Sequence, residues 1–545
     1  MGGKKNCREA DALTRSKAGF PLLTCRTRTR RVFAYLSYGV RWISRGSVRL
    51  LAARTAKPMN HFLNSLRKSV LWIALLAALS AAAQTQAPPS KPAPTPSQTA
   101  VQPEPKISPK EAEDLFHDVD NILQFASKET GLPIKHEVQK QLTSRDQVVA
   151  YLEKTMSEDK DAQRLRRSEL VLKKFGLLPH DFDLQKFLLT LLREQVAGYY
   201  DPKTQTVNLL DWIDADQQRP VMAHELTHAL QDQSFDLEKW MKAGEIDLDN
   251  IPQPKPSDLN GDEISEARQA VVEGQAMVVL VDYMLEPTGQ SILGSPQIAD
   301  ALKEGMLVGS ADAPAFKDAP IFLKEVLTFP YRYGLDFETE LLRAKGKEQA
   351  FAAVFANPPQ TSRQIMEPAT YLSGEHIDPV RLPNFQVDFK SYNRFDLGAM
   401  GEFDVALLVD QYAGVEASHE IYPHWRGGYY YAARPKGHAN APLALLYFSR
   451  WADDDAAREF AAIYAKALEQ RYKNVHESPE DAQRSIPQLK TLRTLNGTHT
   501  WLTGEGPVVI VVQGDTTLIT ESLDQPTTDR LKQELLGTVP SSAKQ

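Results

Sequence analysis

The spacing of apolar residues predicts helices over most of the first half of the chain. Ser108-Pro109-Lys110-Glu111 is typical of a helix start, with a capping Ser, Pro at the first helical position and Glu three residues after the cap. From there the pattern predicts helices near 109–130, 135–142, 144–175 (with a break) and 183–196.

The pattern then changes, because two short segments with strand character flank Asp201-Pro202 within 198–209. This arrangement predicts a β-hairpin, or the beginning of a small sheet, directly before the next helix. An edge strand at this place can hold an extended peptide by main-chain pairing.

Two helices of particular interest are expected after the hairpin. The first covers 221–230, with Asp214 and Asp216 as candidate N-caps and Pro220 in its first turn. The second runs from about 263 to 284. It carries small residues that let another helix approach closely, namely Ala267, Ala270, Gly274 and Ala276.

The rest of the chain changes character near residue 380. Before this point, further helices are expected at 297–307, 321–328 and 335–355. After Val380 the pattern predicts strands at 428–433, 443–449, 490–503, 507–512 and 516–521. Helices are expected there at 454–472 and 526–536. We therefore expect an α+β protein. A mainly helical domain covers 108–379, and a C-terminal α+β domain of unknown role covers 380–545.

The N-terminal segments predict export. From Met59 a basic stretch, a short apolar run and Ser80-Ala81-Ala82-Ala83 follow one another, which is typical of a signal peptide over 59–83. A retained N-terminal anchor is the alternative. Residues 84–107 form a Pro-rich linker. We expect a secreted or periplasmic protein with no stable membrane span after cleavage, because the apolar run is short for a span.

Residues 1–58 do not fit this organisation. They contain 14 Lys/Arg and 2 acidic residues, and both cysteines of the chain, Cys7 and Cys25, lie among them. We interpret Met59 as the true start and 1–58 as a doubtful extension, with an Arg-rich targeting segment as the alternative. Without this stretch, the net charge of −7 becomes about −19. An acidic chain disfavours a nucleic-acid or anionic-membrane partner.

The sequence His224-Glu225-Leu226-Thr227-His228 predicts a metal site. Residues four apart on a helix share a face, so both imidazoles can bind one Zn²⁺. The intervening Glu225 can act as general base on a water that the metal activates. Two ordinary buried histidines are the alternative interpretation.

A zinc site of this kind needs a third protein ligand. No third His follows at short spacing, so a Glu from the second helix is expected, and Glu273 is the best candidate because it lies among apolar residues where an unpaired carboxylate is costly. Glu266, two turns earlier, is the second candidate or an outer partner. A buried ion pair between helices would also account for Glu273.

With Glu273, the motif resembles the gluzincin branch of the zincin metallopeptidases, the thermolysin-like clan. Further segments are similar to a little-characterised group of bacterial secreted gluzincin-like proteins, and the resemblance covers roughly 110–375. These segments are 194–202 (EQVAGYYDP), 224–233 (HELTHALQDQ), Val272-Glu273-Gly274, Phe329-Pro330-Tyr331 with Gly334, and Asn357-Pro358-Pro359 with Thr361-Ser362, Gln364-Ile365 and Pro368. The resemblance implies a zincin-like domain that binds zinc through His224, His228 and Glu273.

The chain departs from these families at three positions. Gln275 replaces the Asp of a Glu-Gly-Asp-Ala motif, and Met277 stands where thermolysin-like enzymes carry an Asp that orients a zinc histidine. Glu367-Pro368 replaces a His-Pro. The predicted ligands and base are unaffected, but the outer groups of the site differ.

The oxyanion of a tetrahedral intermediate also needs a donor besides the metal. Tyr331 is the preferred candidate, with Tyr200 and Tyr333 as others. A packed aromatic residue is the alternative interpretation of each.

These observations predict a secreted zinc metallopeptidase that hydrolyses a peptide or protein substrate, with Glu225 as general base. Two alternatives stay open. One is a non-catalytic zincin-like binding protein of the cell envelope, and the other is a zinc hydrolase acting on a non-peptide amide. The sequence leaves the oligomeric state and the cleavage preference open.

Overall fold

The first described helix begins where the capping pattern predicts. In α3 (Pro109–Thr130) the hydroxyl of Ser108 accepts a hydrogen bond from the backbone of Glu111, whose carboxylate accepts one from the backbone of Ser108.

The structure, a computed structural model, describes residues 106–156, 159–195, 198–244, 246, 248–308, 314–478 and 492–537. All of them belong to the unit Lys57–Gln545. The predicted extension 1–58, signal peptide 59–83 and nearly all of the linker lie outside these residues.

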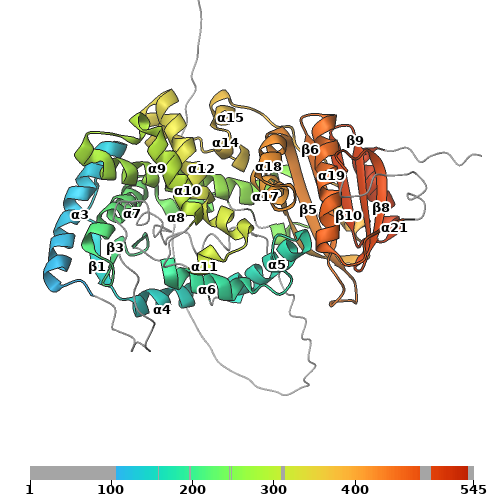
Figure 1. The fold of residues 1–545 in the computed structure, drawn as a ribbon, viewed down its shortest axis with the longest axis horizontal. Coiled ribbons are helices and arrows are strands. Elements are labelled where there is room, and N and C mark those ends of the chain that lie inside the picture. The colour runs from blue at the N-terminus through green and yellow to red at the C-terminus, as the bar shows by residue number, and fades with distance from the viewer. Residues whose placement is uncertain are drawn as a thin grey trace, which may run out of the picture. The chain divides into compact units, whose positions relative to one another are not determined.

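The protein has an α+β fold with two sheets (Figure 1). The smaller sheet has the order β1-β3-β2, in which β1 (Gln139–Thr143) pairs parallel and β2 (Tyr199–Asp201) antiparallel with the central strand β3 (Thr206–Leu210). The hairpin of β2 and β3 confirms the predicted strand–turn–strand. The helix predicted over 135–142 is wrong, because all five residues of β1 pair with β3, a contact remote in sequence that outweighs local helix preference.

The other regular elements before the larger sheet are helices. Their bounds are α4 (Arg145–Met156), α5 (Asp159–Phe175), α6 (Leu184–Gln195), α7 (Ala215–Phe235), α8 (Leu237–Lys242), α9 (Gly261–Leu285), α10 (Pro296–Val308), α11 (Pro314–Lys317), α12 (Ile321–Lys345), α13 (Lys347–Phe351), α14 (Ser362–Met366), α15 (Pro368–Ser373) and α16 (Phe385–Asp388). No helix within the described ranges is long and apolar enough to cross a bilayer.

Four long helices pack in the order α3, α7, α9 and α12 (Figure 1). The crossing of α9 and α12 is the closest of these contacts, because Gly274 and Gly334 meet backbone to backbone. A Cβ atom at Gly274 would overlap the carbonyl group of Gly334, and one at Gly334 would overlap the carbonyl oxygen of Ala270. The small residues of α9, the predicted second helix, therefore allow α12 to pack closely against it.

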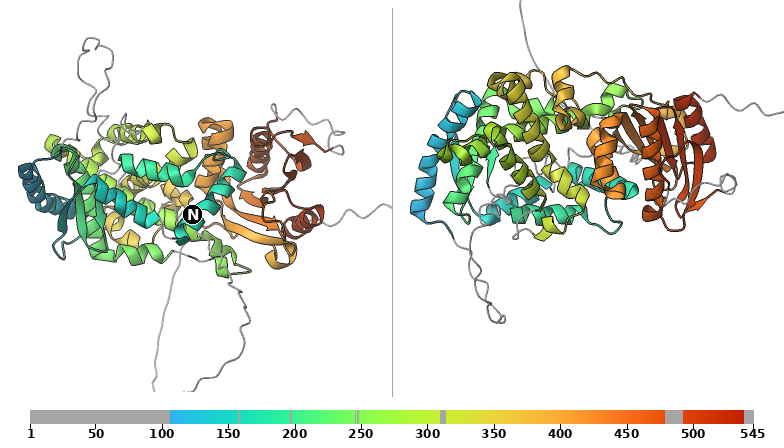
Figure 2. Two further views of the ribbon diagram at one scale, coloured as in Figure 1. Left: turned by 90° about the horizontal axis from the view of Figure 1, so that it is seen from below. Right: turned by 45° about the horizontal axis from the view of Figure 1, so that its top comes forward.

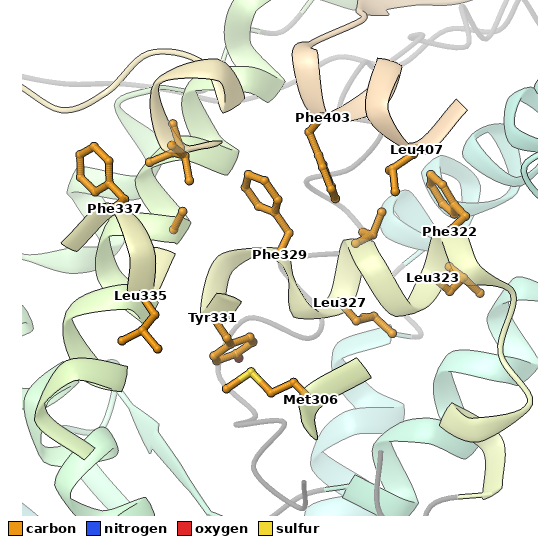
Figure 3. Close-up of a cluster of buried hydrophobic side chains, with 14 of the residues drawn as sticks. Met306, Phe322, Leu323, Leu327, Phe329, Tyr331, Leu335, Phe337, Phe403 and Leu407 are labelled. Atoms are coloured by element: carbon orange, nitrogen blue, oxygen red, sulfur yellow. The ribbon is translucent and has the colours of Figure 1, made fainter. Parts of the chain in front are cut away.

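The structure joins two predicted helices into one. Helices were expected at 321–328 and 335–355, but α12 continues through Pro330 to Lys345. Proline removes one hydrogen bond from a helix interior. Here packing compensates, because the turn around Pro330 is buried and the ring of Phe329 lies 4.1 Å from that of Phe403 between centroids (Figure 3).

The larger sheet lies entirely after residue 391 and has the order β4-β5-β6-β10-β9-β8-β7, with antiparallel neighbours throughout. Its strands are β4 (Tyr392–Ala399), β5 (Trp425–Pro435), β6 (Ala444–Trp451), β7 (His476–Glu477), β8 (Gly497–Thr503), β9 (Gly506–Gln513) and β10 (Thr516–Glu521). Five predicted strands are found, although β8 begins at Gly497 instead of 490. The strands β4 and β7 and the helices α17 (Glu402–Ala413) and α18 (Val415–Ile421) were not predicted from the sequence.

Both faces of this sheet are covered by helices (Figure 2). Along β6, Leu445 and Tyr447 pack in the core that includes α19 (Asp454–Arg471), whereas Leu446 and Phe448 pack in the core that includes α21 (Gln525–Leu536). Successive side chains on a strand point to opposite faces. A strand buried on both faces therefore has a continuous apolar run.

Buried charged groups join the helical part to the part that contains the larger sheet. Oε2 of Glu263 accepts hydrogen bonds of 2.8 Å from the backbone and hydroxyl of Ser362, and that hydroxyl accepts one of 3.2 Å from the backbone of Phe403. Beside it, the guanidinium of Arg363 donates a 2.6 Å hydrogen bond to the fully buried Glu402. The predicted domain boundary at 379/380 stays a prediction, and these contacts cross it.

We expect Gly274→Ala and Gly334→Ala each to lower the free energy of unfolding by about 1–3 kcal/mol, because the added methyl group overlaps backbone atoms that cannot give way. Denaturant unfolding measures this change. Gly305→Ala, in α10, is the control: a Cβ there meets nothing within 4 Å, so the same substitution should stabilise by about 0.5–1 kcal/mol. Equal effects at all three positions would contradict the close crossing.

Glu338 of α12 provides a pH-dependent prediction. It is fully buried, neither carboxylate oxygen hydrogen-bonds to a described residue, and burial raises its pKa well above the usual value. When the pH rises above the pKa of this carboxyl in the unfolded chain, the unfolded chain ionises freely but the folded protein does not. The raised pKa in the folded state therefore lowers the free energy of unfolding at high pH.

We therefore expect Glu338→Gln to melt about 2–4 °C above the wild type at pH 8 and at the same temperature at pH 4. Thermal unfolding at the two pH values measures the difference. Glu340→Gln, at an exposed position of the same helix, should show no such pH-dependent gain. A constant offset at both pH values would mean that Glu338 does not titrate as proposed.

Candidate metal centre

The helix that carries the HExxH motif is attached to the small sheet by a buried amide. Gln218 accepts a 2.8 Å hydrogen bond from the backbone of Leu210 and donates to the carbonyl oxygens of Leu210 and Ile213. The N-cap is Asp214, although its side chain makes no capping hydrogen bond. Pro220 lies at the sixth helical position and not in the first turn as predicted, because α7 begins at Ala215.

The three predicted metal ligands converge in the structure. Nε2 of His224 lies 3.0 Å from Nε2 of His228 and 3.1 Å from Oε2 of Glu273. Nε2 of His228 lies 3.3 Å from the same carboxylate oxygen. The exposed fractions of the three side chains are 1%, 3% and 2%. They form the one group of His, Cys, Asp and Glu with metal-binding proximity among the described residues.

This geometry fits a tetrahedral zinc ion. Bonds of about 2.0–2.1 Å place tetrahedral ligand atoms about 3.3–3.4 Å apart, close to the three observed separations. Two imidazole lone pairs and a carboxylate that face one another repel unless a cation lies between them. The donor set, two nitrogens and one oxygen, is also that of catalytic zinc sites with an open fourth position.

In the metal-free protein a proton takes the place of the cation. Burial lowers the pKa of His224, which therefore stays neutral. Burial also acts to lower the pKa of His228, but the carboxylates of Glu273 and Glu225 outweigh it and raise this pKa to about 9. Burial acts to raise the pKa of Glu273, but the two imidazoles lower it to about 2. His228 and Glu273 thus form a buried ion pair.

Glu225 lies beside this group with one oxygen hydrogen-bonded and one not. Oε2 accepts a 2.8 Å hydrogen bond from the backbone N–H of Tyr200, in strand β2. Oε1 is buried and makes no hydrogen bond to any described residue. Burial raises the pKa of Glu225 to about 7, with His228 opposing the shift. A carboxylate with a pKa near neutrality is suited to accept and return a proton.

The three candidate tyrosines occupy different places. The ring of Tyr331 lies 6.1 Å from that of His224 between centroids, at an angle of 29°. Met306 of α10 lies next to Tyr331 (Figure 3). The hydroxyl of Tyr200 donates a 3.0 Å hydrogen bond to Asp232. Tyr333 packs against Phe329 and Phe403. Of the three, Tyr331 is therefore the one placed beside a predicted metal ligand.

The other predicted outer groups lie elsewhere. Glu266 is buried on α9 but is not part of the cluster formed by His224, His228 and Glu273. Met277 is a fully buried core residue, and Glu367 forms a 3.0 Å ion pair with Arg363. One partner of the site, Gln231, was not predicted from the sequence, although its position three residues after His228 on the same helical face could have revealed it.

No protein-family model, curated protein or solved structure matches this chain. The likeness to the gluzincins therefore stays an interpretation of the sequence motifs. The evidence for a metal centre is the convergence of the side chains themselves.

We expect the wild-type protein to bind about one Zn²⁺ per chain. Glu273→Gln should weaken zinc affinity by more than about 100-fold, because it removes a ligand, whereas outer-shell changes cost about 10–100-fold. Competition with a chelator of known affinity measures this loss.

Glu266→Gln is the matched control, since it alters a second buried carboxylate of the same helix and should change the affinity by less than about tenfold. A folded Glu273→Gln variant with wild-type affinity would remove Glu273 from the ligand set.

Proposed function

We propose that the protein is a zinc-dependent peptidase with a zincin-like catalytic part of the gluzincin type. The observation that carries this proposal is the convergence of His224, His228 and Glu273, with the carboxylate of Glu225 beside them. A buried ion pair needs one histidine and one carboxylate, whereas here the imidazoles of both His224 and His228 face the same carboxylate oxygen of Glu273.

In this mechanism the protein residues position the reactants and move a proton. Zinc, when bound, supplies a Lewis acid that polarises the substrate carbonyl and makes water more acidic. His224, His228 and Glu273 hold the ion. Glu225 accepts the proton of the attacking water through its free Oε1 and returns it to the leaving amine. Tyr331, whose ring lies 6.1 Å from that of His224, is the proposed donor to the developing oxyanion.

The small sheet favours an extended peptide as the substrate. β2 is an edge strand, and its neighbour β3 is paired on both sides. The N–H of Tyr200 donates to Glu225, so the edge of β2 away from β3 faces the proposed general base. Because the N–H of Tyr200 is bound to Glu225, a peptide at this edge would pair through other backbone groups of β2, and its backbone would lie next to the reacting groups.

The reacting groups lie in a largely dry environment, because the proposed ligands and Glu225 are at most 3% exposed. Exclusion of bulk water would strengthen the electrostatic interactions within the site.

The predicted signal peptide supports action outside the cytoplasm, in the periplasm or the medium. The acidic mature sequence agrees with a peptide or protein partner better than with a nucleic acid.

We expect Glu225→Gln to retain zinc and the fold but to lower hydrolysis of an unstructured protein such as casein by at least about 100-fold, because only the proton acceptor is lost. Activity and zinc content are measured on the same sample. Gln217→Met, at an exposed position of the same helix, is the control and should leave both unchanged.

Equal activity in Glu225→Gln and wild type would rule out this mechanism. Bound zinc without proteolysis in the wild type would instead favour one of the two alternative functions, a hydrolase of non-peptide amides or a binding protein.

A further inference from the structure

The imidazole of His228 has a second hydrogen-bond partner besides the proposed metal position. Its Nδ1 lies 2.9 Å from Oε1 of Gln231, one turn later on α7. Nε2 of Gln231 donates to the carbonyl oxygen of Val272, at 3.1 Å, and to Oε1 of Gln275, at 2.7 Å. All these groups are buried.

The direction of these hydrogen bonds is fixed by backbone carbonyls. The oxygen of Val272 can only accept, so the NH₂ group of Gln231 must face it. Likewise, Nε2 of Gln275 donates at 2.7 Å to the carbonyl oxygen of Ala350, which turns Oε1 of Gln275 toward Gln231. The oxygen of Gln231 is thus left for His228, whose Nδ1 must carry a proton to form the bond.

This requirement decides which nitrogen of His228 is available to a metal. With its proton held on Nδ1, the neutral ring presents an unprotonated lone pair at Nε2. Nε2 is the atom that faces Nε2 of His224 and the carboxylate of Glu273.

We propose that Gln231 is the positioning residue of His228, holding the tautomer and ring orientation that metal binding needs, and that Gln275 supports its amide from α9. The proposal rests on the proposed metal-dependent function. It also accounts for the glutamine at position 275. In the chain of hydrogen bonds from Gln231 through Gln275 to Ala350, which we call the relay, residue 275 must both accept and donate. A carboxylate there would be repelled by the Ala350 carbonyl, whereas the neutral amide does not offset the positive charge of a bound ion.

A purely structural role is the alternative, because Gln231 also connects α7 to α9 through Val272. Two variants separate these roles. Gln231→Met removes both the acceptor for His228 and the connection to α9. Gln275→Met removes buried hydrogen bonds of the same relay but leaves the Gln231 oxygen, still oriented by Val272, in contact with His228.

The experiment measures zinc affinity by chelator competition and the melting temperature of the metal-free protein for each variant. We expect both Met variants to melt below the wild type, but only Gln231→Met to lose zinc affinity, by about 10–100-fold. Gln231→Glu keeps an oxygen for His228 but sets its second oxygen against the acceptors of Val272 and Gln275, so it should melt below the wild type and yet retain more zinc affinity than Gln231→Met. Gln217→Met again serves as the control with unchanged affinity.

The proposal would be overturned if Gln231→Met and Gln275→Met lost zinc affinity equally, each in proportion to its loss of stability. It would also be overturned if Gln231→Met bound zinc with wild-type affinity. These outcomes differ from a failure of the proposed function. If the wild type and Gln231→Met differ in zinc affinity as expected but the wild type cleaves no protein, the positioning role stands and the peptidase does not. A wild type that binds no zinc would overturn both.

Discussion

The backbone contact between α9 and α12 is the constraint on which the rest of the site depends. Gly274 and Gly334 allow the two helices to meet without intervening side chains. Glu273 immediately precedes the first of these glycines, and Tyr331 lies three residues before the second. The crossing therefore fixes two groups at once: the carboxylate that faces the α7 histidines, and the aromatic ring that lies against His224.

Burial determines the chemistry at this place. Water is excluded from four ionisable side chains, so each charge depends on the others and not on solvent. In the metal-free state, the proton on His228 balances the Glu273 carboxylate, and desolvation holds the pKa of Glu225 near neutrality. A divalent ion would take over the role of that proton. Metal binding and proton release are therefore coupled in a site of this kind.

The segment around Ser362 and Arg363 has a structural role outside the candidate metal centre. Glu263 at the start of α9 binds Ser362, while Arg363 binds Glu402 in the first turn of α17. Burial raises the pKa of Glu402 to about 8 against the opposing effect of Arg363. The helix that supplies the proposed ligand Glu273 is thus tied at its N-terminus to the part of the chain that holds the larger sheet.

The sequence by itself determined the local features of this protein. The capping box at Ser108, the hairpin before α7, the helices that carry His224 and Glu273, and five strands of the larger sheet follow from periodicity, turn residues and motif spacing. These are short-range properties of the chain. The four residues of the proposed site could also be named, because an i, i+4 histidine pair and a carboxylate among apolar residues are costly to bury unless a cation or a polar partner meets them.

Only the tertiary structure decided the features that depend on partners remote in sequence. Residues 139–143 form a strand because β3 offers unpaired backbone groups. α12 continues through Pro330 because both of its ends are packed, and Gln275 has a role because Gln231 and Ala350 lie on either side of it. Local preferences are worth fractions of a kcal/mol per residue, so the burial of a whole side chain or a row of backbone hydrogen bonds outweighs them.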